Sequence, residues 1–275
     1  MTCDNIKSLP PVSEMMRNVG LTPKKQFGQN FLFDLNLTGR IARSVPDIEH
    51  TDVIEVGPGP GGLTRALLMA GARRVIAIEK DKTTAPILDK IVAASGGRLA
   101  VIYGDALRVN LSEYINGEYA ICSNLPYNVG TELLTHWLTD AAHGALIKSM
   151  TLMFQREVAE RIVAQCSDNQ YGRLAVLVSL VADARILFDV PNTAFVPRPR
   201  VQSAVVQIIP NREKISKISD INRVEKITGK LFGQRRKMIR GIIPNIDWSQ
   251  FGLTGTERAE QIAPETFAQM ARVLV

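Results

Sequence analysis

The chain has 275 residues, with 33 Lys and Arg against 27 Asp and Glu, which gives a formal net charge of +6. Hydrophobic residues make up 45% and charged residues 22%. This balance is typical of a globular protein with a buried core and excludes a disordered chain, a collagen-like repeat or a coiled-coil rod. The length suits one large domain, or one domain with an appendage. The positive excess permits an acidic partner such as nucleic acid, but many proteins without such a partner are equally basic.

Cysteine usage and the absence of targeting signals indicate an intracellular protein. Cys3, Cys122 and Cys166 are odd in number and far apart, so they predict no disulfide framework and favour a reducing compartment. The N-terminal residues are too charged for a secretory signal, and the most apolar stretch, residues 174–182, is too short to span a bilayer. The spacing of His and Cys predicts no metal site. We therefore expect a cytoplasmic protein that uses neither a membrane nor a metal.

The first half of the chain alternates between two kinds of apolar pattern. Residues 1–22 are mixed polar with Pro and Gly, and they predict a flexible, loosely attached arm. Residues 35–44 then have the spacing of an amphipathic helix. Strands are expected at 52–56, 74–79, 99–103, 119–123 and 150–155, and helices at 63–70, 85–94, 131–139 and 158–164. This alternation predicts β-α-β units with a parallel sheet, an α/β fold of the Rossmann-like kind.

The pattern changes after Arg173. A buried helix at 174–182 precedes two strands, at 185–188 and 201–209, which we expect to pair antiparallel at the edge of the sheet. Beyond Pro210 the sequence is helical and loop-like. We therefore predict a Rossmann-like domain over residues 23–210 and a small helical C-terminal domain over residues 211–275.

A glycine-rich loop follows the first strand of the alternation. The residues from Gly57 read G-P-G-P-G-G and lie between an apolar strand and a helix, which is the setting of a nucleotide-binding turn. Glycine lets the backbone turn tightly and lets a ligand approach the main chain. Glu79 ends the second strand, where a carboxylate can accept hydrogen bonds from ribose hydroxyls. Asp105 follows the third strand and could accept the exocyclic amine of an adenine.

Two cofactors fit this loop. Gly57, Gly59 and Gly62 match G-x-G-x-x-G, so a nicotinamide-dependent oxidoreductase is one alternative, and an ordinary β-α turn is another. The two prolines between the glycines remove amide donors that a pyrophosphate would use. Glu55 precedes the loop, where it can organise the turn or meet the cationic end of an amino acid. These two features favour S-adenosylmethionine.

Asn124, Leu125, Pro126 and Tyr127 follow the fourth strand. An adenine N6 is a poor nucleophile because its lone pair is delocalised, so a site that methylates it should accept hydrogen bonds from both N–H groups. The side-chain carbonyl of Asn124 and the main-chain carbonyl of Pro126 can do this, and Tyr127 can stack on a flipped base. An ordinary Asn-Pro turn is the alternative. The position at a strand end of a nucleotide-binding sheet favours catalysis.

Taken together, these motifs resemble those of the small-subunit ribosomal RNA adenine N6,N6-dimethyltransferases, the KsgA-type family. The N-L-P-Y and F-x-Q-R-R-K elements are specific in combination, whereas the glycine loop alone is not. The resemblance covers nearly the whole chain, and its matching segments are residues 24–34, 55–64, 78–81, 104–105, 124–127, 171–174, 195–203 and 234–240.

The resemblance implies an activity and a set of site residues. It implies N6,N6-dimethylation of two adjacent adenosines near the 3′ end of small-subunit (16S) rRNA during subunit assembly, by direct methyl transfer in which positioning supplies most of the catalysis. It also implies that Phe195 works with Tyr127 to hold the target adenine. The residues that it assigns to S-adenosylmethionine are Asn30, Leu32, Gly57, Glu79, Asp105 and Asn124.

Basic residues gather near the C-terminus. Residues 211–250 hold ten Lys and Arg against four acidic residues, which accounts for the positive excess of the whole chain. On a predicted helix or in the Pro-rich loop beside Phe195, cations of this kind contact phosphates and orient RNA, although a solvated helix face is the alternative. The expected RNA-binding residues are Arg198, Arg200, Arg235, Arg236, Lys237 and Arg240, with a further contact from Lys24 and Lys25.

The expected partner is small-subunit rRNA within an assembling ribosomal subunit, and we expect the protein to act as a monomer. One alternative is a methyltransferase of the same architecture that acts on large-subunit rRNA, as the macrolide-resistance enzymes do. The extended basic C-terminal element argues against it. A non-catalytic assembly factor that retains the fold is also open, because an intact site does not measure turnover.

Overall fold

The computed structural model describes residues 2–23 and 29–274. Contacts within the chain divide it into two compact units, which are described separately. Unit 1 contains residues 1–133, 146–156 and 186–208, and unit 2 contains residues 134–145, 157–185 and 209–275. The domain boundary expected after residue 210 lies close to the last passage of the chain from unit 1 to unit 2. Unit 2 also includes two earlier segments, which the sequence pattern did not indicate.

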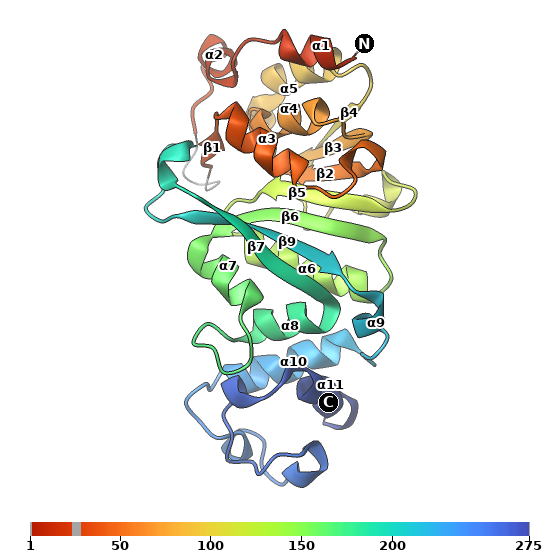
Figure 1. The fold of residues 1–275 in the computed structure, drawn as a ribbon, viewed down its shortest axis with the longest axis vertical. Coiled ribbons are helices and arrows are strands. Elements are labelled where there is room, and N and C mark those ends of the chain that lie inside the picture. Colours follow the sequence, from red (N-terminus) through yellow and green to blue (C-terminus); the bar gives the residue numbers. More distant parts are fainter. Residues whose placement is uncertain (1, 24–28, 275) are drawn as a thin grey trace. The chain divides into compact units, whose positions relative to one another are not determined.

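Eleven α-helices and nine strands are present in the described part of the chain (Figure 1). The helices are α1 (Thr2–Lys7), α2 (Val12–Asn18), α3 (Leu35–Arg43), α4 (Gly62–Met69), α5 (Ala85–Ala94), α6 (Gly130–Ala142), α7 (Arg156–Val163), α8 (Arg173–Val181), α9 (Arg212–Ile215), α10 (Ile221–Phe232) and α11 (Pro264–Val273). The strands are β1 (Phe31–Leu32), β2 (Asp52–Val56), β3 (Arg74–Glu79), β4 (Leu99–Tyr103), β5 (Tyr119–Asn124), β6 (Ile147–Gln155), β7 (Ala182–Val190), β8 (Phe195–Val196) and β9 (Ser203–Pro210).

The main sheet has seven strands in the order β4-β3-β2-β5-β6-β9-β7. Strands β4, β3, β2, β5 and β6 are parallel to one another, and β9 runs antiparallel to β6 with Met150 opposite Ile208. This arrangement confirms the predicted Rossmann-like α/β fold. The order reverses between β2 and β5, because the chain moves outward from β2 to β4 and then returns to the other side of β2. In sheets of this type a ligand binds outside the carboxyl ends of the strands at such a reversal.

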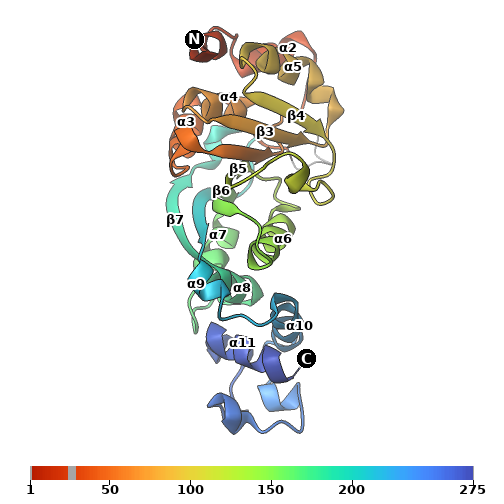
Figure 2. The same cartoon turned by 90° about the vertical axis from the view of Figure 1, so that its right-hand side faces the viewer.

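Helices α3, α4 and α5 lie together on one face of this sheet (Figure 1, Figure 2). Each helix buries an apolar stripe, as Leu67 and Leu68 of α4 and Ile87 and Leu88 of α5 show, all of them 0% exposed. These side chains join one core cluster with the apolar side chains of β2 and β3. The packed helices hold the strand ends, and therefore the loops that follow them, in fixed positions.

The N-terminal residues are packed into unit 1, which differs from the loosely attached arm that the sequence suggested. Ile6 and Met15 are at most 1% exposed and belong to the core cluster. The guanidinium of the buried Arg65 donates hydrogen bonds to the carbonyl oxygens of Ile6 (3.2 Å), Leu9 (3.1 Å) and Pro10 (2.6 Å). The expectation failed because two short helices interrupted by prolines have too weak a periodicity to indicate an apolar face.

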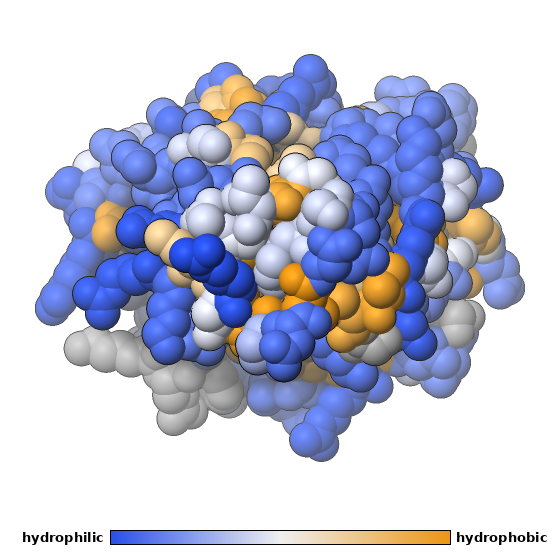
Figure 3. All heavy atoms as spheres, turned by 90° about the horizontal axis from the view of Figure 1, so that it is seen from below, coloured by the Kyte–Doolittle hydropathy of each residue, from blue (hydrophilic) through white to orange (hydrophobic). Residues whose placement is uncertain are grey.

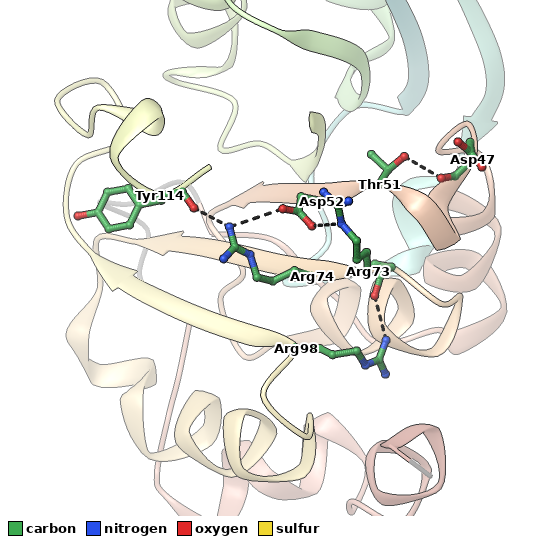
Figure 4. Close-up of polar contacts among 8 residues, drawn as sticks. Asp47, Thr51, Asp52, Arg73, Arg74, Arg98 and Tyr114 are labelled. Carbon is green, nitrogen blue, oxygen red and sulfur yellow. Dashed lines mark hydrogen bonds and ion pairs between the residues drawn. The ribbon is translucent and has the colours of Figure 1, made fainter. Parts of the chain in front are cut away.

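Ion pairs link the residues at which β2 and β3 begin, at the end of the sheet opposite the carboxyl ends of the strands (Figure 4). Asp52 at the start of β2 accepts from Arg73 at 2.8 Å and from Arg74 at 3.5 Å, and Arg74 also donates to the carbonyl oxygen of Tyr114 at 2.5 Å. The Arg73 side chain is 56% exposed, so each pair stabilises the fold by no more than about 1 kcal/mol. These contacts add to the parallel pairing of β2 with β3 at this edge, and they lie at the opposite end of the strands from the carboxyl edge.

Unit 2 is helical, and its core lies among α8, α10 and α11. The ring of Phe232 contacts Tyr171 with centroids 5.9 Å apart and Phe267 with centroids 5.7 Å apart. The Tyr171 hydroxyl donates to the carbonyl oxygen of Ile262 at 2.9 Å, which satisfies its polar atom inside this core. No helix in the described residues has the length and apolar character needed to cross a bilayer.

The basic segment near residue 235 is not α-helical, which corrects one expectation. Helix α10 ends at Phe232, residues 233–237 form turns, and Arg240 lies in a short 3-10 helix over Ile239–Gly241. Glycine at 233 disfavours continuation of the helix. The amides of residues 239 and 240 then donate to the carbonyl oxygens of residues 257 and 255, at 2.8 and 3.1 Å, instead of to the preceding turn.

Candidate active site

A cavity of about 330 Å³ opens at the carboxyl ends of β2, β3 and β5, where the strand order reverses. This volume lies in the range of small-molecule sites. Unit 1 supplies all of the lining, which includes segments that are far apart in the sequence. Eleven of the residues expected from the sequence line it, namely Asn30, Leu32, Glu55, Gly57, Gly59, Gly62, Glu79, Asp105, Asn124, Pro126 and Tyr127.

The glycine loop adopts backbone conformations that favour glycine. Gly57 and Gly59 have φ values of +69° and +53°, in the left-handed region. A Cβ atom on Gly59 would lie 2.8 Å from the ring of Phe31, and one on Gly62 would lie 2.5 Å from the carbonyl oxygen of Leu32. These glycines therefore permit β1 to close over the loop, in addition to allowing the loop to turn.

Glu79 is held rigidly at the end of β3. Its Oε2 accepts a hydrogen bond from the amide of Gly59 at 2.9 Å, and its Oε1 accepts one from the amide of Asp81 at 2.7 Å. Burial raises the pKa of Glu79, and these amide bonds oppose that effect. Each carboxylate oxygen has a second lone pair, so the fixed side chain can still accept ribose hydroxyls from the cavity.

Asp105 is an ionised acceptor at the rim of the cavity. Its Oδ2 accepts a hydrogen bond from the ammonium group of Lys80 at 2.8 Å, and its Oδ1 accepts one from the amide of Leu107 at 3.2 Å. The bond from Lys80 is the main cause that lowers the pKa of Asp105. An ionised carboxylate in this position accepts hydrogen bonds and donates none, which suits the exocyclic amine of an adenine.

Glu55 lies at the floor of the cavity and is 1% exposed. Burial raises its pKa to about 8, although Thr64 donates to its Oε2 at 2.6 Å and opposes the shift, while the charge of Glu79 adds to it. Of the described lining residues, Lys80 alone is cationic, and it is bound to Asp105. With three carboxyl groups and one paired cation among the described lining residues, this cavity fits a ligand with a sulfonium and an ammonium group, whose charge would favour the ionised form of Glu55, and it would repel a pyrophosphate.

The side chain of Asn124 and the carbonyl group of Pro126 differ in whether they can accept a hydrogen bond from a ligand. Asn124 donates its Nδ2 to the carbonyl oxygen of Asn30 at 3.0 Å, which turns its Oδ1 away from that carbonyl and leaves it as an acceptor. The carbonyl oxygen of Pro126 accepts the amides of Val129 at 3.2 Å and Gly130 at 3.0 Å, at the start of α6. Both of its lone pairs are engaged there, so the geometry does not support the expected role of this carbonyl as an adenine acceptor.

The two aromatic residues expected to hold a base are placed differently from one another. Tyr127 lines the cavity, and its hydroxyl lies 2.7 Å from the Oγ of Ser203. Phe195 is 2% exposed, pairs with Leu32 across β1 and β8, and is not among the lining residues in the described part of the chain. The structure therefore brings Tyr127 to the site, whereas Phe195 is buried in the core beside a strand whose Leu32 lines the cavity.

The expected RNA-binding residues that the structure describes are all exposed. Arg198 donates to Asn192 at 2.9 Å within its loop. Arg235 is engaged by Glu260 at 3.3 Å and by the carbonyl oxygen of Asn169 at 2.8 Å. Arg200, Arg236, Lys237 and Arg240 complete the set, whereas Lys24 and Lys25 lie outside the described residues.

Two residues at the site were not singled out from the sequence. Lys80 directly follows Glu79, and its contact with Asp105 depends on the pairing of β3 with β4, which the local sequence does not indicate. Ser203 belongs to a segment that carries the family resemblance, but it lies 76 residues from its partner Tyr127. No local pattern indicates such a contact.

Comparison with known proteins agrees with this site. Residues 20–274 match the ribosomal RNA adenine dimethylase family. Proteins named ribosomal RNA small subunit methyltransferase A are 50% identical in Azorhizobium caulinodans, with 97% of this chain and 93% of that protein covered, and 47% identical in Chelativorans sp., with 98% and 99% covered. The crystal structure of a dimethyladenosine transferase from Plasmodium falciparum aligns with a TM-score of 0.73 at 24% identity, covering 87% of this chain and 95% of that one, which supports the fold.

These matches extend over both units and decide between the cofactors that the glycine loop left open. The match does not support a nicotinamide-dependent oxidoreductase, and the acidic lining of the cavity argues against that cofactor independently. The chain therefore belongs to the ribosomal RNA adenine dimethylase family and is a methyltransferase that uses S-adenosylmethionine.

Proposed function

We propose that this protein dimethylates N6 of two adjacent adenosines near the 3′ end of small-subunit rRNA while the subunit assembles. The names of the relatives, which are 47 to 50% identical, support the small subunit over the large one as the target. The observation that carries the chemistry is the Asn124 amide, fixed by the carbonyl of Asn30 at the edge of a cavity that Tyr127 also lines.

The lining residues fit S-adenosylmethionine, which supplies an electrophilic methyl group when it is bound. Glu79 would accept the ribose hydroxyls, and Asp105 would accept the amine of the cofactor's adenine. Glu55 lines the cavity and would accept a hydrogen bond from the cationic part of the ligand, whose charge would favour the ionised form of this carboxyl group. Gly57 and Leu32 would border the ligand through main-chain and apolar contacts, respectively.

Asn124 would activate the target nitrogen by positioning it. Its Oδ1 accepts one N–H of the amino group, which draws the N6 lone pair out of conjugation and directs it toward the cavity. The Pro126 carbonyl is engaged by α6, so we assign the role of acceptor to the side-chain amide of Asn124. A monomethylated N6 retains one N–H, and a single acceptor can therefore serve both methyl transfers. Tyr127 would stack on the flipped base.

RNA binding would draw on exposed cations from both units. Arg198 and Arg200 belong to the loop of unit 1 that follows Phe195, and residues 236–240 belong to unit 2. Figure 3 faces the C-terminal elements and shows mainly hydrophilic side chains there, with smaller apolar patches. Arg235 is already bound to Glu260, so we assign it a weaker part in RNA binding than its neighbours have.

The remaining proposals concern organisation and location. We propose that residues 23–210 carry catalysis and that residues 211–275 bind the ribosomal RNA, because the positive excess of the chain lies between residues 211 and 250. We also propose a cytoplasmic monomer, since the substrate is a ribosomal subunit and one copy of unit 1 contains the whole cavity lining.

The direct test compares unmethylated small and large ribosomal subunits as substrates. Each is incubated with the protein and labelled S-adenosylmethionine, and the rRNA is then digested and mapped by nucleoside analysis. The expected product is N6,N6-dimethyladenosine at two adjacent positions near the 3′ end of the small-subunit rRNA. Label confined to the large subunit, or in a different nucleoside, would overturn the proposal.

A further inference from the structure

Tyr127 is tied to a buried serine on the antiparallel part of the sheet. Its hydroxyl and the Oγ of Ser203 are 2.7 Å apart, and Ser203 is 0% exposed. Burial raises the pKa of Tyr127, and the bond with Ser203 opposes that shift, so the phenol is neutral at physiological pH. Tyr127 lines the cavity, while its hydroxyl is bound to a serine that is buried inside the protein.

The fold places Ser203 firmly. It is the first residue of β9, and its register partner on β6 is Gln155. The amide of Arg156 donates to the carbonyl oxygen of Gln202 at 2.9 Å, which fixes the backbone just before Ser203. A hydroxyl on a paired strand has little freedom, so it can hold its partner in one orientation.

The segment 195–203, which ends at Ser203, also pairs with strand β1 beside the glycine loop. Phe195 in β8 pairs with Leu32 of β1, and Leu32 lines the cavity. Only the exposed loop around Arg198 and Arg200 separates Phe195 from Ser203. The segment 195–203 therefore connects the strand that closes over the glycine loop with the ring of Tyr127.

We infer that Ser203 is a positioning residue for methyl transfer. It fixes the ring of Tyr127, so that an adenine stacked on this ring keeps its N6 within hydrogen-bonding distance of Asn124. The inference rests on the proposed function, because it assumes a base stacked on Tyr127. A free phenol can rotate about its side-chain torsions, and each alternative orientation reduces the fraction of bound bases that can react. The second methyl transfer depends on the same restraint, because the remaining N–H of the monomethylated N6, and not its methyl group, must then face the Oδ1 of Asn124.

The experiment compares Ser203→Ala, Tyr127→Phe and the double variant with the control Ser149→Ala. Ser149 lies on β6 and is 1% exposed, and within the described structure its Oγ has no hydrogen-bond partner. The control therefore removes a buried hydroxyl from the same sheet without removing a bond. Initial rates are measured on unmethylated small subunits, the affinity for S-adenosylmethionine by calorimetry, and the ratio of mono- to dimethyladenosine by nucleoside analysis.

Ser203→Ala should lower kcat about tenfold, since one neutral hydrogen bond is lost, with unchanged cofactor affinity and a larger share of monomethyl product. Tyr127→Phe removes the same bond, so the double variant should be no slower than Tyr127→Phe alone. Ser149→Ala should match the wild type. Additive losses in the double variant, or equal rates for Ser203→Ala and Ser149→Ala, would overturn the inference.

A second measurement separates this inference from the proposed function. The ring resonances of Tyr127 can be followed with labelled tyrosine, because the chain has five tyrosines and Tyr127→Phe identifies the signal. Ser203→Ala should shift or broaden it, and Ser149→Ala should not. An unmoved signal contradicts the positioning role even if the enzyme is active, whereas a wild type that forms no dimethyladenosine contradicts the proposed function.

Discussion

Replacing Glu55 by Gln removes the ionisable group at the floor of the cavity and keeps its shape. Glu55 is 1% exposed, and burial raises its pKa to about 8 from an ordinary value of 4.5. Between these two pH values the folded protein retains a proton that the unfolded chain has lost. The free energy of unfolding therefore decreases as pH rises through this window, since stability falls wherever the folded state binds more protons.

The magnitude follows from that shift. One pKa unit corresponds to about 1.4 kcal/mol, and raising the pH from about 6 to about 9 crosses the folded-state pKa. The wild type should lose roughly 2 to 3 kcal/mol more over this interval than Glu55→Gln does. Urea unfolding followed by far-UV circular dichroism, at several pH values and without cofactor, measures the difference.

Thr64 offers a control for the cause of the shift. It donates to Glu55 at 2.6 Å and opposes the effect of burial on the pKa, so Thr64→Val should move the transition to higher pH. If the free energies of unfolding of the wild type and Glu55→Gln had the same pH dependence, Glu55 would be ionised in the folded protein across this window, which would contradict the raised pKa.

Three further changes test other parts of the structure. Arg65→Met leaves three carbonyl groups of residues 6–10 without their donor and should lower the free energy of unfolding by about 2 kcal/mol in a urea titration. Gly62→Ala places a Cβ atom 2.5 Å from the carbonyl oxygen of Leu32, and it should weaken S-adenosylmethionine binding about tenfold in calorimetry by displacing β1. Arg236→Glu with Lys237→Glu should weaken binding of small-subunit rRNA. It should also reduce the slope of the logarithm of the binding constant against the logarithm of the salt concentration, by about one unit per lost phosphate contact.

The changes at Gly62 and at Arg236 and Lys237 each have a matched control. Gly241→Ala adds a Cβ atom that meets nothing within 4 Å, and it should leave cofactor affinity unchanged. Lys217→Glu reverses an exposed charge of unit 2 that is paired with Glu213, and it should affect RNA binding less than the changes at 236 and 237. Equal effects of the control and the test variant would contradict the corresponding reasoning.

The sequence predicted the parts of the site that follow from strand order. Glu79, Asp105 and Asn124 each end or follow a parallel strand, and the carboxyl ends of parallel strands meet at one edge, so their convergence needs no detailed packing. The apolar runs of β2 and β3 were long and regular enough to give their boundaries, at 52–56 and 74–79.

The remaining features depend on contacts between distant segments. The bond between Ser203 and Tyr127 joins residues 76 apart, and the bonds from Arg65 hold an N-terminal segment whose own pattern is weak. The main-chain carbonyl of Pro126 was assigned to substrate because sequence does not show where a carbonyl points, and the structure directs it into α6. The basic segment was expected to be helical, but its amides pair with residues 255–257.

The amide of Asn124 carries the central claim, that this site positions an adenine N6 for methylation. The most direct measurement is the rate of dimethyladenosine formation by Asn124→Ala on unmethylated small subunits at saturating S-adenosylmethionine. We expect kcat to fall on the order of 100-fold, as when a preorganised hydrogen-bonding group is lost from an active site. A variant that methylates these subunits at the wild-type rate would contradict the account.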